Sequence, residues 1–394
     1  MGLRGHAAIV GFAEFKHERK YSGPRLFTVE QWSELTAMAL DDAGLQLADV
    51  NGIACTDIRE SGMFTPATIV EYLGQPVNFA ERIDLGGASS VGMVWRAAAA
   101  IELGIADVVV CATPALPIPS NPEPRAIDPR RFFQSSSNEW GSPQAEFEIP
   151  YGNLAQNCGY AMIAQRYGAE FGYNEEAMAK LVVDQRQNGA LNPLAAFYGK
   201  PTTAKEVLAS KMIADPLRML EIVMPVAGGG AVVVASREVA ERCRHRPVRI
   251  TGFGEHLTIK TPTYAKDMCV TPVGPASRQA FTMAGLEPGD IDAAEIYDCY
   301  TITVLMTLED AGFCAKGEGQ RFIMDSGMTH DGNFPLNTHG GQLGMGQAGA
   351  AGGMTQVVEA ARQIMGRAED RQVSACDNVY VSGTGGIMSE QAAL

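Results

Sequence analysis

The chain has 394 residues, of which 46% are hydrophobic and 19% are charged, and its formal net charge at pH 7 is −14. This balance predicts a soluble, folded protein and excludes a disordered chain. The negative charge argues against binding to nucleic acid or to an anionic membrane. No apolar run approaches the roughly 18 residues of a membrane span, and the first residues lack the apolar core of a signal peptide. We therefore expect a cytoplasmic protein.

In chain order, the hydrophobic pattern predicts alternating strands and helices. The expected strands lie at residues 7–12, 107–110, 248–253 and 378–381, and the expected helices lie at residues 28–40, 91–103, 153–171, 175–188 and 355–365. Thr28 and Gln31 have the spacing of a capping box at the start of the first helix. Strands that alternate with helices in this way predict mostly buried sheets covered by helical layers.

An internal repeat divides the chain into two similar halves. At one constant offset, residues 9–14 align with residues 250–255, and residues 43–45 align with residues 284–286. Each copy reads as a strand, an amphipathic helix, a glycine turn and a second strand, so the sequence predicts a duplicated βα unit. We expect an N-terminal half at residues 1–245 and a C-terminal half at residues 246–394.

The first half is longer because it contains an insertion at about residues 114–215, which begins with a proline-rich stretch. An insertion on a duplicated core is a natural place for substrate recognition, and the alternative is a lid with structural work only.

The cysteines and histidines do not form a recognisable ligand pattern. None of the eight cysteines belongs to a CxxC pair, and the six histidines show no HExxH spacing. Scattered cysteines in a chain of this length are typical of reduced, buried thiols. The sequence therefore predicts no metal site.

Several segments in a fixed order, together with the repeat, resemble the thiolase superfamily. They are IELGIADVVVCAT at residues 101–113, DIDAAEIYDCYT at 290–301, NTHGGQLGMGQAGAAGG at 337–353 and VSGTGG at 381–386. The resemblance is to the sterol-carrier-protein-x or lipid-transfer type. It implies a five-layer αβαβα fold made from two halves, a coenzyme A thioester as substrate and a homodimer formed through the strand near residues 108–112 and its neighbours.

The thiol groups of ordinary thiolases are absent at the matching positions. Thiolases hold the acyl group on a cysteine thiolate at a helix N-terminus, and that position falls on or beside Gly87. The histidine that activates the thiol matches Gln347, and the second cysteine matches Ser382 or Gly383. A divergent acyltransferase that uses Ser89 as its nucleophile is an open alternative.

The remaining groups resemble the cysteine-less branch of lipid-transfer-protein aldolases. These enzymes cleave a β-hydroxyacyl-CoA by retro-aldol chemistry, typically while shortening steroid side chains. Tyr297 matches a tyrosine that the branch uses as acid and base, and His339 has a pKa suited to proton transfer. The small residues Gly340, Gly341 and Gly385 have the character of loops that bind a thioester oxygen.

A second tyrosine of the branch falls near Gln347, so His339 would have to take its role. Tyr300 and Gln347 are expected to line the pocket. Tyr297 also fits a packed core tyrosine, and His339 also fits a brace for the glycine turn.

The resemblance also bears on partners. Members of the branch often work with a small OB-fold, zinc-ribbon subunit, so a heteromeric complex is expected. Arg130 and Arg131 could meet the phosphates of coenzyme A or could simply be solvated. The third functional hypothesis is a non-catalytic subunit that binds acyl-CoA or lipid and stabilises an active partner.

Overall fold

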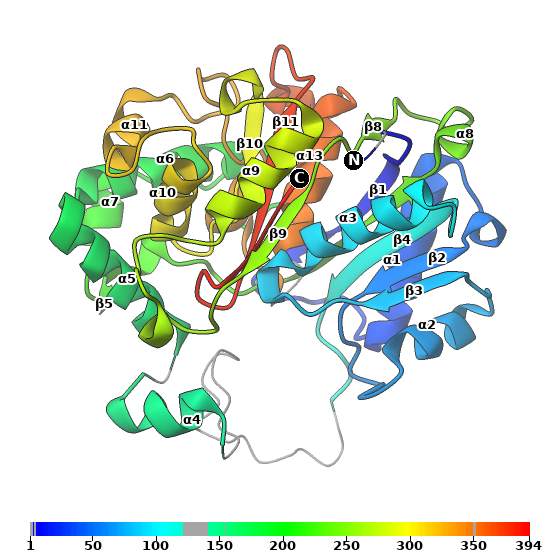
Figure 1. The fold of residues 1–394 in the computed structure, drawn as a ribbon, viewed down its shortest axis with the longest axis horizontal. Coiled ribbons are helices and arrows are strands. Elements are labelled where there is room, and N and C mark those ends of the chain that lie inside the picture. The colour runs from blue at the N-terminus through cyan, green and yellow to red at the C-terminus, as the bar shows by residue number, and fades with distance from the viewer. Residues whose placement is uncertain (1–2, 4, 121–140, 154, 350–351) are drawn as a thin grey trace.

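The computed structural model describes residue 3 and residues 5–120, 141–153, 155–349 and 352–394. In this part of the chain, two β-sheets lie on either side of a central pair of helices, and further helices cover their outer faces (Figure 1). Arg130 and Arg131, the arginines considered for the coenzyme A phosphates, lie outside the described residues.

Four strands of the first sheet, β2-β4-β7-β1, have the same order as the four strands of the second sheet. The first sheet has the order β3-β2-β4-β7-β1-β8 and consists of β1 (Ala8–Glu18), β2 (Gly52–Cys55), β3 (Phe79–Arg82), β4 (Val108–Ala115), β7 (Ala227–Ala235) and β8 (Val248–Arg249). The second sheet has the order β10-β11-β12-β9 and consists of β9 (Gly254–Leu257), β10 (Ala293–Glu295), β11 (Val379–Gly385) and β12 (Glu390–Ala393). In β2-β4-β7-β1 and in β10-β11-β12-β9, one parallel pair is followed by two antiparallel pairs. The first sheet also has the parallel pair β2–β3 and the antiparallel pair β1–β8. The sequence repeat is therefore also a repeat of topology.

The helices form three layers around the sheets. The outer layer on the first sheet contains α1 (Thr28–Ala43) and α2 (Thr65–Leu73), the central layer contains α3 (Ser89–Glu102) and α13 (Gly352–Ile364), and the outer layer on the second sheet contains α9 (Val273–Ala284) and α10 (Thr301–Asp310). Both central helices contact both sheets. This is the expected αβαβα arrangement.

Two glycines that the repeat aligns explain how closely the outer helices approach the sheets. A Cβ atom on Gly11 in β1 would lie 2.7 Å from the carbonyl oxygen of Ala39 in α1. A Cβ atom on Gly252, just before β9, would overlap the carbonyl oxygen of Ala280 in α9. In both halves, glycine therefore lets the helix backbone lie directly against the chain beneath it.

The insertion contains the two long helices that the sequence predicts, α5 (Gln156–Phe171) and α6 (Glu175–Leu191). Its shorter elements are α4 (Pro143–Phe147), α7 (Ala204–Ala209), β5 (Met212–Ala214) and β6 (Leu217–Arg218), and the other short helices of the chain are α8 (Arg237–Ala240), α11 (Gly319–Asp325) and α12 (Gly341–Met345). Helix α6 packs against α11 and α12. The insertion thus reaches the glycine-rich turn of the second half.

The strand pairing bears on two expectations, the contact of the homodimer and the boundary between the two halves. The strand at residues 108–112 is an interior strand, because β4 is paired with β2 on one side and with β7 on the other. It has no free edge, whereas β3 lies at the edge of the same sheet. The homodimer through this strand and its neighbours stays a prediction. Strand β8 lies after residue 245, in the expected C-terminal half, but it pairs with β1 of the first sheet. The boundary between the halves stays a prediction.

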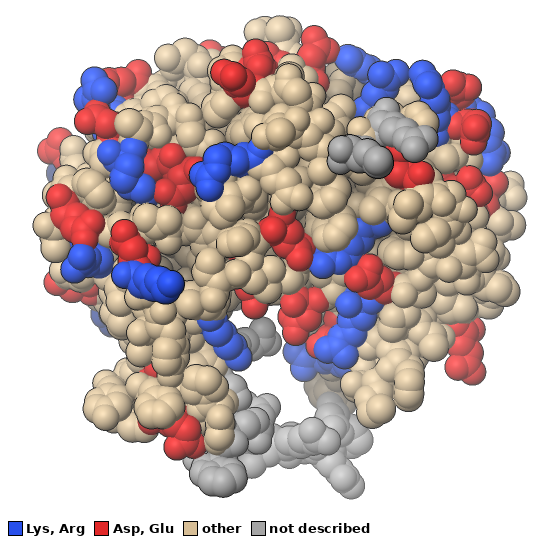
Figure 2. Space-filling model, in the orientation of Figure 1, with Lys and Arg blue, Asp and Glu red and all other residues tan. Residues whose placement is uncertain are grey.

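The surface carries charges of both signs. On the face drawn in Figure 2, Lys and Arg side chains lie among Asp and Glu side chains. Exposed pairs such as Arg82 and Asp57 each contribute about 0–1 kcal/mol to stability, because water screens them. None of the described helices has the length and apolar character needed to cross a membrane.

Candidate active site

Tyr297 lies directly after β10, and its hydroxyl faces the turn that precedes α3. A Cβ atom on Gly87 in that turn would overlap the Tyr297 hydroxyl and the carbonyl oxygen of Thr384. The space of a side chain at position 87, where the sequence predicts the degenerate nucleophile position, is therefore occupied by a phenol. Gly87 is glycine because no side chain fits beside Tyr297.

Gln347 fixes the orientation of the Tyr297 hydroxyl. The Gln347 Nε2 group donates a hydrogen bond of 3.0 Å to the Tyr297 oxygen, so the hydroxyl hydrogen is free to point toward another acceptor. The side chain of Tyr297 is 3% exposed, and this burial raises the pKa of Tyr297 well above its usual value. The phenol is therefore protonated at neutral pH.

Tyr300 lies three residues after Tyr297 but has different hydrogen-bond and stacking partners. Its hydroxyl donates to Asn157 Oδ1 in α5 at 2.6 Å, and its ring stacks on Tyr160 with the ring centres 4.0 Å apart. Tyr300 thus joins the insertion to the second half. Its expected role in lining the pocket stays a prediction.

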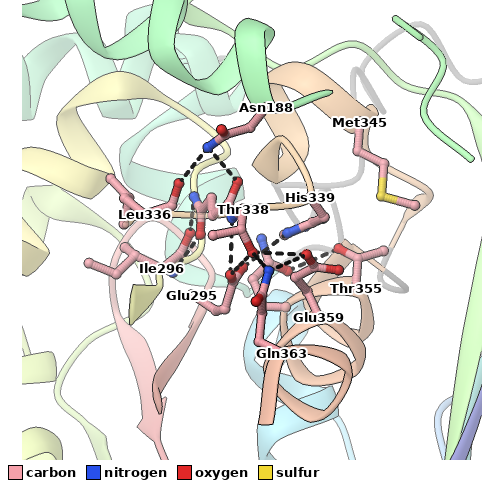
Figure 3. Close-up of polar contacts among 12 residues, drawn as sticks. Asn188, Glu295, Ile296, Leu336, Thr338, His339, Met345, Thr355, Glu359 and Gln363 are labelled. Atoms are coloured by element: carbon pink, nitrogen blue, oxygen red, sulfur yellow. Dashed lines mark hydrogen bonds and ion pairs between the residues drawn. The ribbon is translucent and has the colours of Figure 1, made fainter. Parts of the chain in front are cut away.

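His339 lies in a buried ionic network next to β10 (Figure 3). Its Nδ1 atom is 3.0 Å from Glu295 Oε2, and both side chains are at most 1% exposed. The other oxygen of Glu295 accepts hydrogen bonds from the backbone and hydroxyl of Thr338. Burial opposes the charged imidazolium, but Glu295 and then Glu359 and Glu14 outweigh it, so the pKa of His339 is raised.

Glu359 of α13 is the anionic centre of this network. It accepts hydrogen bonds from Arg362 at 2.5 Å, from Arg371 at 3.3 Å and from the Thr338 hydroxyl at 2.8 Å. Burial disfavours its charge, but Arg371 and Arg362 hold the pKa of Glu359 at about 2. Arg362 also reaches Glu14 of β1 at 2.5 Å. The buried network thus joins the two sheets through α13.

The structure does not bond the two predicted proton-handling residues to each other. Among the described residues, no hydrogen bond joins Tyr297 to His339, because the Tyr297 hydroxyl meets Gln347 and the His339 ring meets Glu295. The roles of both residues therefore stay predictions. The charged partners of His339 were not identified from the sequence. The only signal was a charged residue within an apolar or alanine-rich segment, at Glu295 and Glu359.

The predicted glycine loops have tight packing partners. A Cβ atom on Gly340 would lie 2.5 Å from the Cα atom of Gly189 in α6, and one on Gly341 would overlap the Asp298 carboxylate. A Cβ atom on Gly385 would overlap the carbonyl oxygen of Leu85. These contacts account for glycine at each position, and binding of a thioester oxygen there stays a prediction.

Asp298 caps the short helix that follows the glycine turn. Its carboxylate accepts hydrogen bonds from the backbone of Gln342 at 2.7 Å and of Leu343 at 3.1 Å. Burial raises the pKa of Asp298 to about 6, although these two N–H groups favour the charged form. The residue next to Tyr297 thus holds α12 in place.

Among the described residues, Ser89 has only backbone partners. The Ser89 hydroxyl donates to the Gly86 carbonyl at 2.7 Å and accepts from the Leu85 backbone at 2.9 Å, so it stabilises the turn before α3. All eight cysteines are free. Among them, Cys299 follows Asp298 directly, and burial raises the pKa of its thiol to about 11. A thiol with this pKa is not a nucleophile at neutral pH.

One group of side chains in the described part of the chain has the spacing of metal ligands. The ligand atoms of Glu170, Asp267 and Cys269 lie within 4.8 Å of one another. The two acidic residues are exposed, and burial raises the pKa of the Cys269 thiol to about 11, which makes its sulfur a poor ligand at neutral pH. We assign no function to this group.

Comparison with known proteins agrees with the fold. Residues 254–394 match the family described as thiolase C-terminal domain-like. A steroid side-chain-cleaving aldolase of Thermomonospora curvata is 31% identical over 403 aligned residues, covering 97% of this chain and 96% of the relative. A 17-hydroxy-3-oxo-4-pregnene-20-carboxyl-CoA lyase of Mycobacterium tuberculosis is 33% identical over 404 residues, with 97% of each chain covered.

A solved structure, described as an Ltp2-ChsH2(DUF35) aldolase, superimposes with a TM-score of 0.86 at 30% identity, covering 100% of this chain and 98% of that chain. The chain therefore belongs to the thiolase superfamily. Within the superfamily, it belongs to the lipid-transfer branch that contains aldolases, which confirms the resemblance drawn from the motifs.

Proposed function

We propose that this protein is an acyl-CoA carbon–carbon lyase that cleaves a β-hydroxyacyl-CoA by a retro-aldol reaction without a covalent acyl-enzyme. The observation that carries this proposal is the Tyr297 hydroxyl, which occupies the space of a side chain at Gly87. The activities for which two relatives are named, steroid side-chain cleavage and acyl-CoA lysis, support the same reaction class. A coenzyme A ester of a steroid side chain is the proposed substrate.

The chemistry requires two proton transfers and one stabilised enolate. The β-hydroxyl loses its proton, its oxygen becomes a carbonyl, and the electron pair of the broken Cα–Cβ bond moves into the thioester enolate. The α-carbon then gains a proton, which leaves a ketone or aldehyde and a shorter acyl-CoA. Backbone groups near Gly340, Gly341 and Gly385 are proposed to hold the enolate oxygen.

Tyr297 is suited to give the proton to the α-carbon, because its buried phenol is protonated and Gln347 leaves its hydrogen free. His339 is proposed to receive the proton of the β-hydroxyl. Its raised pKa makes the imidazole a stronger base, and Glu295 stabilises the imidazolium that forms.

The quaternary structure is also a proposal. The solved relative is described as a complex with a DUF35 protein, which supports a small partner subunit of this chain. We further propose a homodimer that forms through β4 and its neighbouring strands.

The reaction is tested by incubating the protein with β-hydroxyacyl-CoA esters and following both the products and the mass of the chain. We expect a ketone or aldehyde, a shorter acyl-CoA and an unchanged protein mass. An acylated chain would support the acyltransferase alternative instead. Acyl-CoA binding without turnover, with every partner tried, would support a non-catalytic subunit.

A further inference from the structure

His17, near the end of β1, has a buried ring that reaches the glycine-rich segment of the other half of the chain. The side chain is 1% exposed, and its Nδ1 atom lies 3.0 Å from the carbonyl oxygen of Gly346. A carbonyl can only accept a hydrogen bond, so Nδ1 must carry the hydrogen. The backbone N–H of His17 donates to the Leu194 carbonyl at 2.8 Å, which fixes the strand at this point.

The His17 ring lies in a space that Gly228 leaves open. A Cβ atom on Gly228 of β7 would lie 2.6 Å from His17 Nε2 and 2.5 Å from its Cδ2 atom. Glycine at this position therefore leaves the space that the ring occupies. Burial lowers the pKa of His17 despite the nearby Glu14, and His339 lowers it further, so the ring is neutral and donates from Nδ1.

The Gly346 carbonyl belongs to a turn whose other backbone groups are also held. The Gly346 N–H donates to the Gln342 carbonyl, the Gln347 N–H donates to the Met224 carbonyl, and the Gln347 carbonyl accepts from the Val226 N–H, each at 2.9 Å. The turn has a φ angle of +100° at Gly346. The peptide between Gly346 and Gln347 is therefore held on both sides, by His17 at its carbonyl and by Met224 at its N–H.

We infer that His17 is a positioning residue for Tyr297. By holding the Gly346 carbonyl, it fixes the start of Gln347, whose side chain donates to the Tyr297 hydroxyl at 3.0 Å. This inference rests on the proposed function of Tyr297, but the geometry of the turn can be tested separately. His17 has no direct contact with Tyr297 among the described hydrogen bonds, so it acts through Gln347.

Three variants separate positioning from general loss of stability. His17→Phe keeps an aromatic ring but removes the donor, so only the bond from the Gln347 N–H to the Met224 carbonyl still holds this peptide, and its carbonyl can tilt. We expect kcat for β-hydroxyacyl-CoA cleavage to fall about 10- to 100-fold with KM unchanged. His17→Asn places an amide N–H near the position of Nδ1 and should restore most of kcat. Gly228→Ala displaces the ring without removing a polar group and should lower kcat in the same way.

A double-mutant cycle tests the route through Gln347. Gln347→Ala alone should lower kcat, and adding His17→Phe should cause little further loss, because the side chain that His17 positions is already gone. Losses that multiply, equal loss in His17→Phe and His17→Asn, or an unchanged kcat in His17→Phe would each overturn the inference. Gly289→Ala, where a Cβ atom meets nothing within 4 Å, is the matched control for Gly228→Ala.

A crystal structure of the His17→Phe variant tests the inference even if the proposed reaction is wrong. We expect the carbonyl of the Gly346–Gln347 peptide to tilt and Gln347 Nε2 to move out of hydrogen-bond reach of the Tyr297 oxygen. An unchanged turn with this bond retained would overturn the inference. If His17→Phe does not fold, the structure of Gly228→Ala gives the same test. Absence of cleavage by the wild-type protein would count against the proposed function alone.

Discussion

Two side chains cannot occupy the space between the turn before α3 and the strand end after β10. A residue with a Cβ atom at position 87 would overlap the hydroxyl of Tyr297, so a nucleophilic side chain and this phenol exclude each other. Gln347, which the motifs match to the histidine of ordinary thiolases, donates a hydrogen bond to the Tyr297 hydroxyl. If Tyr297 is the acid that we propose, glycine at position 87 is a condition for it.

Replacing Tyr297 by Phe tests this acid directly. The variant removes the hydroxyl and keeps the ring, so we expect kcat for β-hydroxyacyl-CoA cleavage to fall about 100-fold or more, the usual contribution of a general acid. The assay is steady-state formation of the shorter acyl-CoA. Tyr198→Phe, at a tyrosine that is 53% exposed, serves as the control. Turnover equal to wild type in Tyr297→Phe would remove Tyr297 from the mechanism.

His339 gives the protein a stability component that depends on pH. Because the folded state raises its pKa above the usual 6.5, the component is fully present below about pH 6.5 and is lost as the pH rises through the folded pKa. In His339→Gln the component is absent. Over about pH 6 to 9, urea unfolding of this variant should therefore show a smaller loss of unfolding free energy than the wild type.

The exposed His256 provides the control for this measurement, since His256→Gln should keep the wild-type pH dependence. An equal pH dependence in His339→Gln and the wild type would show that Glu295 does not raise the pKa of His339 in solution.

At the scale of elements, the two copies of the repeat share a close contact between a helix and the chain beneath it. Gly11 and Gly252 each admit a helix backbone, and the helix residues they meet, Ala39 and Ala280, are also aligned by the repeat. The beginning of α1 shows where local rules fail. Phe27 is the N-cap, and Glu30 accepts from its N–H at 2.6 Å.

Thr28 and Gln31, the expected capping pair, have other roles. Thr28 is already inside α1, and Gln31 bonds the backbone of Leu26 and Leu116 instead. Both side chains are buried, and a local sequence rule does not include tertiary partners.

Substitution of either aligned glycine should have the same effect. Gly11→Ala and Gly252→Ala each force a methyl group into a helix backbone, so we expect each to lower the free energy of unfolding by about 2 kcal/mol. Denaturant unfolding measures the change, with Gly289→Ala as the control. A loss at only one of the two positions would contradict equivalent packing in the two halves.

At the scale of the whole molecule, the site lies where the two halves meet. Gly87 comes from the first half, whereas Tyr297, Gln347 and Thr384 come from the second. The insertion adds Asn157 of α5 to the same region through Tyr300. Neither half contains all of these residues. The contacts among Gly87, Tyr297, Gln347 and Thr384 therefore occur once, although the fold is duplicated.

A small partner subunit is expected to act at this same scale. If the chain works in a complex like that of its solved relative, co-expression with the DUF35-type protein of its own host should give a stable complex and higher turnover than the isolated chain. Size-exclusion chromatography and the cleavage assay measure both properties. The heteromeric proposal fails if no such protein co-elutes and the isolated chain is fully active.

Much of this architecture follows from the sequence. The repeat and the alternation of strands and helices predict two similar halves with buried sheets. The motifs resemble those of thiolases, and this resemblance implies the five layers and points to Gly87, Tyr297 and Gln347. These features are local or are fixed by order along the chain, so no coordinates are needed to find them. The missing cysteine is likewise visible in the sequence alone.

The tertiary structure alone decides which charges are buried and which residues support the site. Glu295, Glu359 and Arg362 meet His339 or one another only after α13 packs between the sheets, and His17 meets Gly346 across 329 positions of sequence. A charged or neutral state inside a protein depends on the groups that surround it in space. Folding creates that environment. The motif order in the sequence is therefore enough to find Tyr297, but only the tertiary structure identifies the residues that contact it.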